Sequence, residues 1–279
     1  MFKKYALIGE DLSYSFSVKV HENLFTVSGV PAKYEILEIP RADFGKKQVW
    51  QTLNALDGFN VTIPYKQAVL AHVSVEDDVR LLGSINTVKN NEGNLCGYNT
   101  DVFGFLQSLE QLGALKVKRF CVIGCGATAR AIAVSLVVAG AEHVTVVVRN
   151  FYSQRLQELL KALKTANNFV NIYVCDLNNG IGNGKFELLI NATPVGTYPR
   201  NDSFVFGTEV LKQVDFVFDV VYNPKETALI KMAKKHGKKC CSGFPMLVWQ
   251  AVMAHKLWYG ASFEDGVIEQ LIDDLMQKL

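Results

Sequence analysis

The sequence has no long hydrophobic run and no excess of charge of one sign. Its 29 basic and 27 acidic residues leave a formal net charge of +2, too small to indicate a nucleic-acid or membrane-surface partner. The most apolar region, residues 131–148, is interrupted by Gly140, Glu142 and His143, so it predicts a buried helix followed by a buried strand. The apolar run near the N-terminus is far too short for a signal peptide. We therefore expect neither a membrane nor a nucleic-acid partner.

The sequence also lacks cysteine patterns that bind metals or form disulfides. The six cysteines show no metal-ligand spacing and lie at positions 96, 121, 125, 175, 240 and 241. Cys240 and Cys241 are adjacent, and neighbouring cysteines rarely reach disulfide geometry. These features predict a reduced, cytoplasmic protein without a metal site.

The first hundred residues contain an alternation of strand and helix patterns. The predicted strands are residues 5–9, 33–39 and 59–63, and the predicted helices are residues 18–29, 44–56 and 66–73. Residues 84–99 predict a β-hairpin around an Asn-Glu-Gly turn. Alternation of this kind predicts an α/β domain with a largely parallel sheet.

From residue 119 the alternation becomes regular. Short, continuous apolar strands are predicted at residues 119–124, 143–148, 171–177, 186–193 and 215–221. Helices between them are typical of a doubly wound, or Rossmann, parallel sheet. We expect an N-terminal α/β domain over residues 1–101, a Rossmann domain over 102–243, and C-terminal helices within 244–279 that pack back on the first domain.

A glycine turn joins the first Rossmann strand to its helix. "VIGCGATAR" (122–130) places Gly124 where the chain turns tightly and Gly126 where a pyrophosphate approaches a helix N-terminus. Ala129 takes the third position, where close helix–strand packing tolerates glycine or alanine. In this context the pattern predicts a dinucleotide site, against the alternative of a merely structural turn.

The end of the next strand distinguishes between the two nicotinamide cofactors. An NAD site usually has an acidic residue there, whereas this sequence has Arg149, Asn150 and Arg155 and no acid. A guanidinium matches a 2′-phosphate in charge and geometry, which favours NADP. The alternative is that Arg149 is an ordinary solvated strand end.

One lysine occupies an unusual position. In "NVTIPYK" (60–66), Pro64 is expected to begin a helix, which places Lys66 in the first turn, at the positive end of the helix dipole. Reduction of a ketone by hydride needs a proton donor, and the dipole would make the Lys66 ammonium readier to release its proton. The alternative is a lysine whose ammonium simply reaches solvent.

An aspartate precedes a further predicted helix, in "GYNTDVFGF" (97–105). Asp101 either caps this helix or accepts a hydrogen bond from a substrate hydroxyl and holds Lys66 in orientation. The residues alone support both interpretations.

The serines of "SYSFS" (13–17) also have two interpretations. An extended chain would place Ser13, Ser15 and Ser17 on one face, where several hydroxyls could hold a carboxylate. The alternative is a polar loop in which Ser17 caps the next helix.

Together these motifs resemble those of shikimate dehydrogenases, which reduce 3-dehydroshikimate with NADPH. The matching segments are "GEDLSYSFSVKVHENLF", "NVTIPYK", "INT", "GYNTD", "GCGATAR", "NATPVG", "DVVYNPKET" and "GFPMLVWQA". The resemblance implies that Lys66 is the catalytic lysine and Asp101 its partner. The substrate-binding residues that it implies are Ser15, Ser17, Thr62, Asn86, Tyr222 and Gln250. The NADP-binding residues that it implies are Gly124, Cys125, Gly126, Ala127, Thr128, Arg149, Asn150, Arg155, Asn191, Thr193, Val220, Gly243 and Met246.

The sequence departs from the family pattern at several positions. Tyr14 replaces a histidine, Val18 a proline, Val148 an asparagine and Ser242 an aspartate, and the cofactor turn reads Gly-Cys-Gly-Ala rather than Gly-Ala-Gly-Gly. The stretch to Arg155 is one residue longer. None of these differences removes a proposed catalytic group.

The resemblance implies an NADP-dependent shikimate dehydrogenase with a substrate-binding N-terminal domain and an active site in the cleft between two domains. We expect a monomer or homodimer that acts on a small molecule. One alternative is a quinate or dual quinate/shikimate dehydrogenase that uses NAD or NADP. Another is a non-catalytic NADP-sensing protein, which predicts that catalytic groups have been lost.

Overall fold

The computed structural model describes residues 2–13, 15–181, 184–198, 204–264 and 266–279. The chain divides into two compact units. Unit 1 comprises Met1–Gly104 and Val248–Leu275, and unit 2 comprises Phe105–Leu247 and Met276–Leu279. No helix in the described ranges is long and apolar enough to cross a bilayer.

Unit 1 is built on a mixed five-stranded sheet in the order β2-β1-β3-β4-β5. Its strands are β1 (Lys3–Gly9), β2 (Ala32–Glu38), β3 (Gly58–Val61), β4 (Thr87–Asn91) and β5 (Asn94–Tyr98). β1 pairs with β2 and β3 in parallel, whereas β3–β4 and β4–β5 are antiparallel. The predicted sheet is therefore parallel in only one half, because the hairpin adds two antiparallel strands.

The predicted hairpin and first helix of unit 1 are confirmed. Glu92 and Gly93 in the hairpin turn have positive φ angles of 54° and 95°, as a tight two-residue turn between twisted strands requires. Helix α1 (Ser17–Ser28) ends at Gly29, whose φ of 67° is a left-handed C-cap. The helices that follow in the chain are α2 (Lys47–Asn54), α3 (Asp77–Leu82), which was not predicted, and α4 (Thr100–Leu112).

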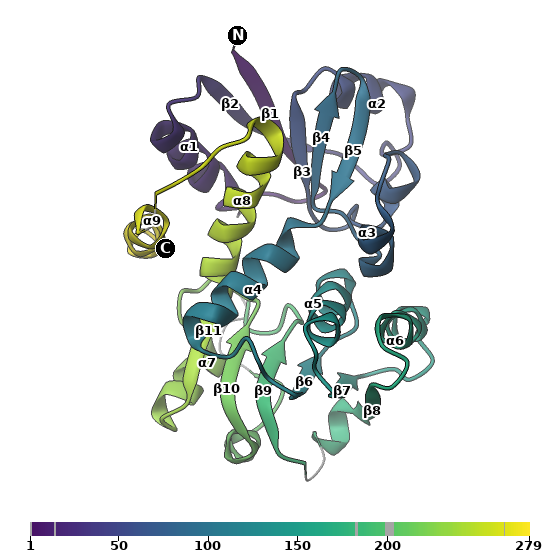
Figure 1. Cartoon of the computed structure of the whole chain (residues 1–279), viewed down its shortest axis with the longest axis vertical. Coiled ribbons are helices and arrows are strands. Elements are labelled where there is room, and N and C mark those ends of the chain that lie inside the picture. Colours follow the sequence, from purple (N-terminus) through teal and green to yellow (C-terminus); the bar gives the residue numbers. More distant parts are fainter. Residues whose placement is uncertain (1, 14, 182–183, 199–203, 265) are drawn as a thin grey trace. The chain divides into compact units, whose positions relative to one another are not determined.

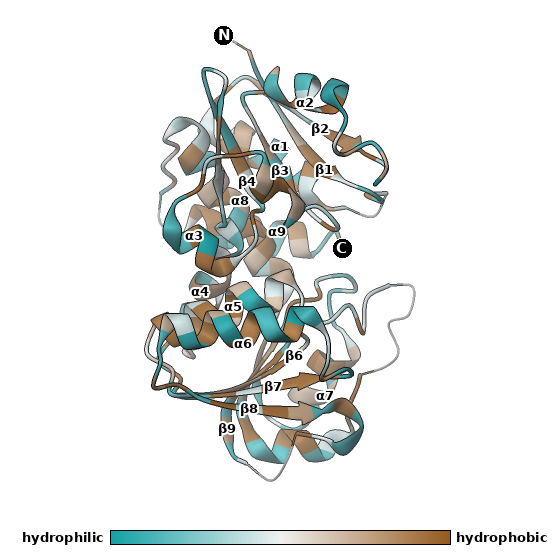
Figure 2. Ribbon diagram, turned by 90° about the vertical axis from the view of Figure 1, so that its right-hand side faces the viewer, coloured by the Kyte–Doolittle hydropathy of each residue, from teal (hydrophilic) through white to brown (hydrophobic). Residues whose placement is uncertain are grey.

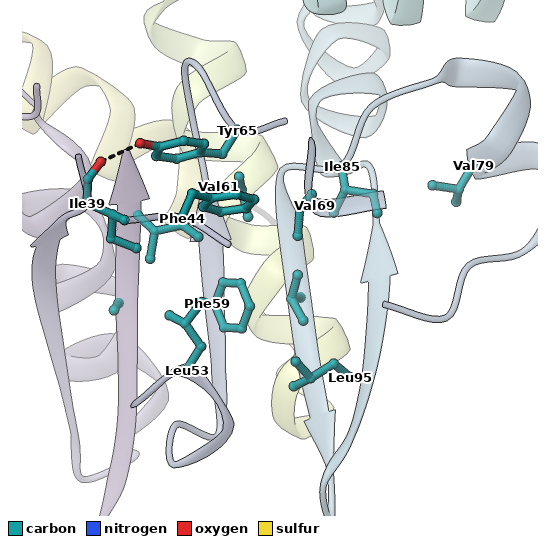
Figure 3. Packing of buried hydrophobic residues seen from close by; sticks show 13 residues of the cluster. Ile39, Phe44, Leu53, Phe59, Val61, Tyr65, Val69, Val79, Ile85 and Leu95 are labelled. Atoms are coloured by element: carbon teal, nitrogen blue, oxygen red, sulfur yellow. Dashed lines mark hydrogen bonds between the residues drawn. The ribbon is translucent and has the colours of Figure 1, made fainter. Parts of the chain in front are cut away.

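One face of the unit 1 sheet carries a buried apolar cluster (Figure 3). The rings of Phe44 and Tyr65 stack at 4.2 Å, and the Tyr65 hydroxyl donates to the Ile39 carbonyl oxygen. Phe59 and Val61 of β3 are buried in the same cluster. The strand that precedes the "TIPYK" turn is thus fixed by packing, and Tyr65 anchors the turn itself.

Helix α8 (Gly243–Tyr259) contributes a second set of aromatic contacts to unit 1, and α9 (Val267–Met276) follows it. Trp258 stacks on Tyr5 at 4.3 Å and donates from Nε1 to the Val88 carbonyl oxygen (3.0 Å). His255 lies 2.9 Å from His21, Nε2 to Nδ1, and burial lowers the pKa of His255 to about 3 and that of His21 well below its ordinary value. Both rings are therefore neutral, and the pair joins α8 to α1 as an uncharged contact.

Unit 2 has a six-stranded sheet in the order β11-β10-β9-β6-β7-β8, with every pair parallel. The strands are β6 (Arg119–Ile123), β7 (His143–Val148), β8 (Asn171–Asp176), β9 (Phe186–Asn191), β10 (Val214–Asp219) and β11 (Lys239–Ser242). Helices α5 (Ala127–Val138) and α6 (Gln154–Ala166) lie on one face and α7 (Ala228–Lys235) on the other (Figures 1 and 2). This strand order is that of the doubly wound fold, so the predicted Rossmann sheet is confirmed.

Candidate active site

Lys66 and Asp101 form a largely buried ion pair in unit 1. Lys66 Nζ lies 2.6 Å from Asp101 Oδ2, and the two side chains are only 15% and 10% exposed. The Lys66 carbonyl oxygen accepts from the Ile85 N–H (2.7 Å), which fixes the turn after β3 against the start of the hairpin. The proposed acid–base lysine therefore points at its proposed partner and not into solvent.

The predicted helix beginning at Pro64 is wrong. The Ile63–Pro64 peptide bond is cis, Tyr65 N–H donates to the Thr62 carbonyl oxygen (2.9 Å), and only one short 3₁₀ turn follows, at Ala68–Ala71. The chain must reach β5 quickly, because Ser74 N–H already donates to the Leu95 carbonyl oxygen (2.9 Å). This pairing overrides the helical pattern, and the helix-dipole argument for Lys66 fails with it.

Asp101 lies in the first turn of α4, but other residues satisfy the N-terminus of that helix. Asn99 Oδ1 accepts from the Val102 N–H (3.3 Å), and Asn86 Oδ1 accepts from the Thr100 N–H (2.6 Å). The Asp101 carboxylate is therefore not used as a cap. Its Oδ1 accepts from Asn86 Nδ2 (2.9 Å) and its Oδ2 from Lys66.

Two buried amides complete this cluster. Asn86 Nδ2 also donates to Gln250 Oε1 on α8 (3.2 Å), which in turn accepts from the Thr100 hydroxyl (3.3 Å). The Thr100 N–H fixes the orientation of the Asn86 amide, so its nitrogen faces the Asp101 carboxylate. The structure thus brings together four of the predicted site residues: Lys66, Asp101, Asn86 and Gln250.

Of the two interpretations of the serines, the extended one does not hold for Ser17, which is helical. Ser17 is the first residue of α1 and is buried, with Phe16 at the N-cap position, so the capping alternative for Ser17 is wrong as well. Ser15 Oγ accepts from the Ser17 N–H (3.3 Å), whereas Ser13 is exposed and donates to Asp11. The helix begins too early for the alternation to continue.

Thr62 and Tyr14 also bear on the prediction of a substrate site. Thr62, half-buried directly after β3, donates its N–H to the Ile8 carbonyl oxygen (2.9 Å). Tyr14, which departs from the family pattern, lies outside the described residues.

The cofactor turn of unit 2 has the geometry that the glycine pattern predicts. Gly124 has a φ of 105°, and an added Cβ there would lie 3.1 Å from Thr193 Cγ2. Gly126 is the N-cap of α5, and a Cβ added there would meet nothing within 4 Å. Ala129 is fully buried against the sheet. Cys125, Ala127 and Thr128 complete a turn that leaves open space before a helix N-terminus, which fits a pyrophosphate.

The turn after β7 presents its basic residues to solvent. Arg149, Asn150 and Arg155 are exposed, and in the described ranges neither guanidinium has a carboxylate partner. Asn150 Oδ1 accepts from the Tyr152 N–H (2.9 Å), and Ser153 caps α6. Cys125 Sγ lies 3.8 Å from Ser153 Oγ, so this turn adjoins the glycine turn. The donor set fits a 2′-phosphate.

The remaining predicted cofactor residues cluster at the carboxyl ends of β9, β10 and β11. Asn191 ends β9, and its Oδ1 accepts from the Thr193 hydroxyl (2.7 Å). Val220 follows β10, Gly243 begins α8, and Met246 is buried one turn later. Tyr222, a predicted substrate residue, is half-buried in the segment after Val220.

Sequence analysis missed one residue of this region, Asp219. It is fully buried at the end of β10, and burial raises the pKa of its carboxyl to about 6. An acidic residue inside the apolar run "FVFDVV" was the available signal, because carboxylates are almost never fully buried without partners. No group of histidine, cysteine or acidic residues among the described residues could hold a metal ion.

Comparison with known proteins gives a consistent match. Residues 7–88 match the family model described as the shikimate dehydrogenase substrate binding domain. A shikimate dehydrogenase (NADP(+)) of Caldicellulosiruptor saccharolyticus is 35% identical over 270 residues, covering 92% of each chain.

Two solved structures show the same fold. The shikimate 5-dehydrogenase of Thermus thermophilus, in complex with NADP(H) and shikimate, has a TM-score of 0.83 at 30% identity, covering 98% of this chain and 99% of that one. The quinate dehydrogenase of Corynebacterium glutamicum, in complex with NAD, has a TM-score of 0.85 at 28% identity, covering 99% of this chain and 100% of that one.

Proposed function

Because the chain belongs to the shikimate dehydrogenase family, we propose that it catalyses the reversible, NADPH-dependent reduction of 3-dehydroshikimate to shikimate, a step in the synthesis of chorismate and the aromatic amino acids. The observation that carries this proposal is the buried Lys66–Asp101 pair, braced by the Asn86 and Gln250 amides. A non-catalytic NADP-sensing protein would have no reason to keep such a pair, because it costs desolvation energy.

The two predicted domains would divide the ligands between them. The N-terminal domain, residues 1–101 with the helices of 244–279, would hold the substrate, and the Rossmann domain, residues 102–243, would hold NADP. The family match over residues 7–88 supports the first assignment. The parallel sheet and the glycine turn support the second.

Substrate recognition needs hydrogen-bonding groups for one carboxylate and several ring hydroxyls. Ser15 and Ser17 would donate to the carboxylate, so no buried arginine is required. Thr62 and Tyr222 would be further substrate contacts. The ring hydroxyls would be held by Asn86, Asp101 and Gln250, which already share hydrogen bonds, so their polar atoms converge before any substrate arrives.

Lys66 supplies the proton of the reaction. NADPH, when bound, supplies a hydride to the ring ketone, whose oxygen then needs one proton to become the hydroxyl of shikimate. The Lys66 ammonium donates that proton and is left as a neutral amine, which solvent protonates again. Asp101 Oδ2 accepts a hydrogen bond from Lys66 Nζ, so the ammonium is already oriented before the reaction begins. In the oxidative direction Lys66 takes the proton back.

NADP would be held by the turns of unit 2. The pyrophosphate fits the Gly124–Thr128 turn at the N-terminus of α5. Arg149, Asn150 and Arg155 would contact the 2′-phosphate. The nicotinamide end would lie against the segments that contain Asn191, Thr193, Val220, Gly243 and Met246.

Replacing Arg149 with alanine is expected to raise the Kd for NADPH about tenfold to a hundredfold, because a charge-assisted hydrogen bond to the 2′-phosphate is lost. The Kd for NADH should change little, since that cofactor has no such phosphate. Both constants can be measured by titrating the fluorescence of the reduced nicotinamide. Arg119→Ala removes an exposed arginine at the opposite end of the neighbouring strand and should change neither value. Equal losses for both cofactors would contradict the assigned role.

The decisive experiment compares shikimate and quinate, each with NADP and with NAD, in steady-state oxidation. We expect the largest kcat/KM with shikimate and NADP. The structural likeness to an NAD-bound quinate dehydrogenase makes quinate the proper competitor. A clear preference for quinate with NAD would make the chain a quinate dehydrogenase, and NADP binding without turnover of either acid would favour the sensor.

We further propose a cytoplasmic location for this protein. All six cysteines are free thiols, which fits a reducing compartment. We expect a monomer or homodimer, which light scattering after size-exclusion chromatography would resolve.

A further inference from the structure

Three hydrogen-bond donors from three segments of unit 2 converge on the buried carboxylate of Asp219. Its Oδ1 accepts from Asn191 Nδ2 (2.9 Å) and from the Val221 N–H (3.1 Å), and its Oδ2 accepts from the Thr227 hydroxyl (2.6 Å). Thr227 in turn caps α7 by accepting from the Ile230 N–H (3.2 Å). The carboxylate therefore ties together the ends of β9 and β10 and the start of α7.

Asn191 connects Asp219 to the glycine turn between β6 and α5. Asn191 Nδ2 also donates to the Val195 carbonyl oxygen (3.1 Å), and Asn191 Oδ1 accepts from the hydroxyl of Thr193 (2.7 Å). Thr193 packs against the glycine turn, since its Cγ2 would lie 3.1 Å from a Cβ at Gly124. A displacement of the Asn191 amide would therefore move the residue that packs against this turn.

Backbone hydrogen bonds hold the 220–222 segment to the end of β9 and to the start of α8. Val220 N–H donates to the Asn191 carbonyl oxygen (2.9 Å), and the Val221 carbonyl oxygen accepts from the Gly243 N–H (3.1 Å). Asp219 holds the same segment through the Val221 N–H. The 220–222 segment thus lies between a buried carboxylate and the start of α8.

We propose that Asp219 is a positioning residue for the cofactor, whose carboxylate holds the 191–195 turn and the 220–222 segment in the arrangement that binds the nicotinamide end of NADPH. This inference rests on the proposed function, because it takes those segments as the nicotinamide site. Asp219 itself is fully buried, so it acts through Asn191 and Val221 rather than by touching the cofactor.

Protonation of Asp219 would weaken this arrangement. Burial raises the pKa of Asp219 to about 6, against the lowering effect of the hydrogen bonds from Thr227, Val221 and Asn191. The groups that face it from β9, from the 220–222 segment and from the start of α7 are all neutral donors, and the neighbouring strand β11 places the neutral Ser242 opposite it. A protonated carboxyl would direct its own O–H toward one of these donors. NADPH binding should therefore be strongest above pH 6 and weaken as the pH falls through that value.

The test replaces Asp219 with asparagine and measures NADPH binding by fluorescence titration, which requires no turnover. We expect the Kd above pH 6 to rise about tenfold to a hundredfold, because hydrogen bonds to a charged group are lost. Asp215→Asn is the matched control, an exposed aspartate on the same strand that should leave the Kd unchanged.

The pH dependence separates Asp219 from the cofactor's own ionisation. The 2′-phosphate of NADPH also titrates near pH 6, so NADH, which lacks it, is the probe for this arm. The wild-type Kd for NADH should rise as the pH falls through about 6, and Asp219→Asn should abolish that rise. A rise that persists in the variant would overturn the proposal.

A merely structural role gives a different result. In that case Asp219→Asn would lower the melting temperature but leave the NADPH affinity and the pH dependence of the folded protein unchanged. If this variant does not fold, two variants of Thr227, the hydroxyl donor to Asp219, test the proposal instead. Thr227→Val should weaken NADPH binding, and Thr227→Ser, which keeps the hydroxyl, should bind NADPH as the wild type does. Equal binding by both variants would overturn the proposal. Failure of the proposed function would appear separately, as wild-type NADPH binding without shikimate turnover.

Discussion

Replacing Lys66 with methionine is expected to lower kcat for shikimate oxidation by a factor of about 10²–10⁴, with a much smaller change in the KM for shikimate. Methionine keeps most of the length and apolar volume of the lysine but has no proton to exchange. The hydrogen bond from Asn86 still holds the Asp101 carboxylate. The loss should therefore fall on the chemical step, which steady-state rates with saturating NADP would measure.

Two variants make this result interpretable. Lys47→Met alters an exposed lysine of the same unit and should leave kcat unchanged. Asp101→Asn keeps Lys66 but removes the carboxylate that orients it, so kcat should fall by a smaller factor than in Lys66→Met. Unchanged turnover in Lys66→Met, with the melting temperature preserved, would show that the proton comes from another group.

Lys66 also shows where sequence reasoning reaches its limit. The sequence identified the residue but gave the wrong physical reason, because residues 66–73 have a helical pattern that the pairing of Ser74 with β5 overrides. The ion pair with Asp101 spans 35 positions of the chain. No local pattern encodes such a contact, so the residues alone left Asp101 with two interpretations, and the resemblance to a known family favoured the pair.

Elements whose cause is local could be predicted well. The hairpin depends on positive φ angles at Glu92 and Gly93, and α1 ends at a left-handed glycine, both of which a short motif specifies. The Rossmann sheet could be predicted because its central strands β6, β7 and β9 are continuous apolar runs that are almost wholly buried. The edge strand β11 was not predicted, because its residues Lys239–Ser242 form no apolar run. The extended interpretation of the serines failed because helix α1 begins at Ser17, one residue before the start predicted from the sequence.

Features that depend on close approach between distant segments could not be predicted. The buried role of Asp219 requires donors from Asn191 and Thr227, which lie 28 and eight positions away. Position 243 requires glycine because a side chain there would overlap the Val220 carbonyl group, which lies directly after β10. Sequence resemblance marked Gly243 as a cofactor residue, but the structure gives a different and stronger reason for it.

Replacing Gly243 with alanine is expected to destabilise unit 2 by at least about 2 kcal/mol and to weaken NADPH binding more than about tenfold. The added Cβ would lie 2.0 Å from the Val220 carbonyl oxygen and 2.6 Å from its carbonyl carbon. Both are backbone atoms, so no change of side-chain rotamer can relieve the overlap. Either the start of α8 or the 220–222 segment must move. Thermal unfolding and NADPH fluorescence titration would measure the two effects.

The two effects of Gly243→Ala should appear together if the 220–222 segment moves, because that is the segment that Asp219 holds through the Val221 N–H. Gly207→Ala is the matched control in the same unit, since its φ of −73° suits alanine and a Cβ there meets nothing within 4 Å. That variant should keep both its melting temperature and its NADPH affinity. Full NADPH affinity in a destabilised Gly243→Ala protein would mean that the shift is absorbed by α8 alone, and that the 220–222 segment does not form part of the cofactor site.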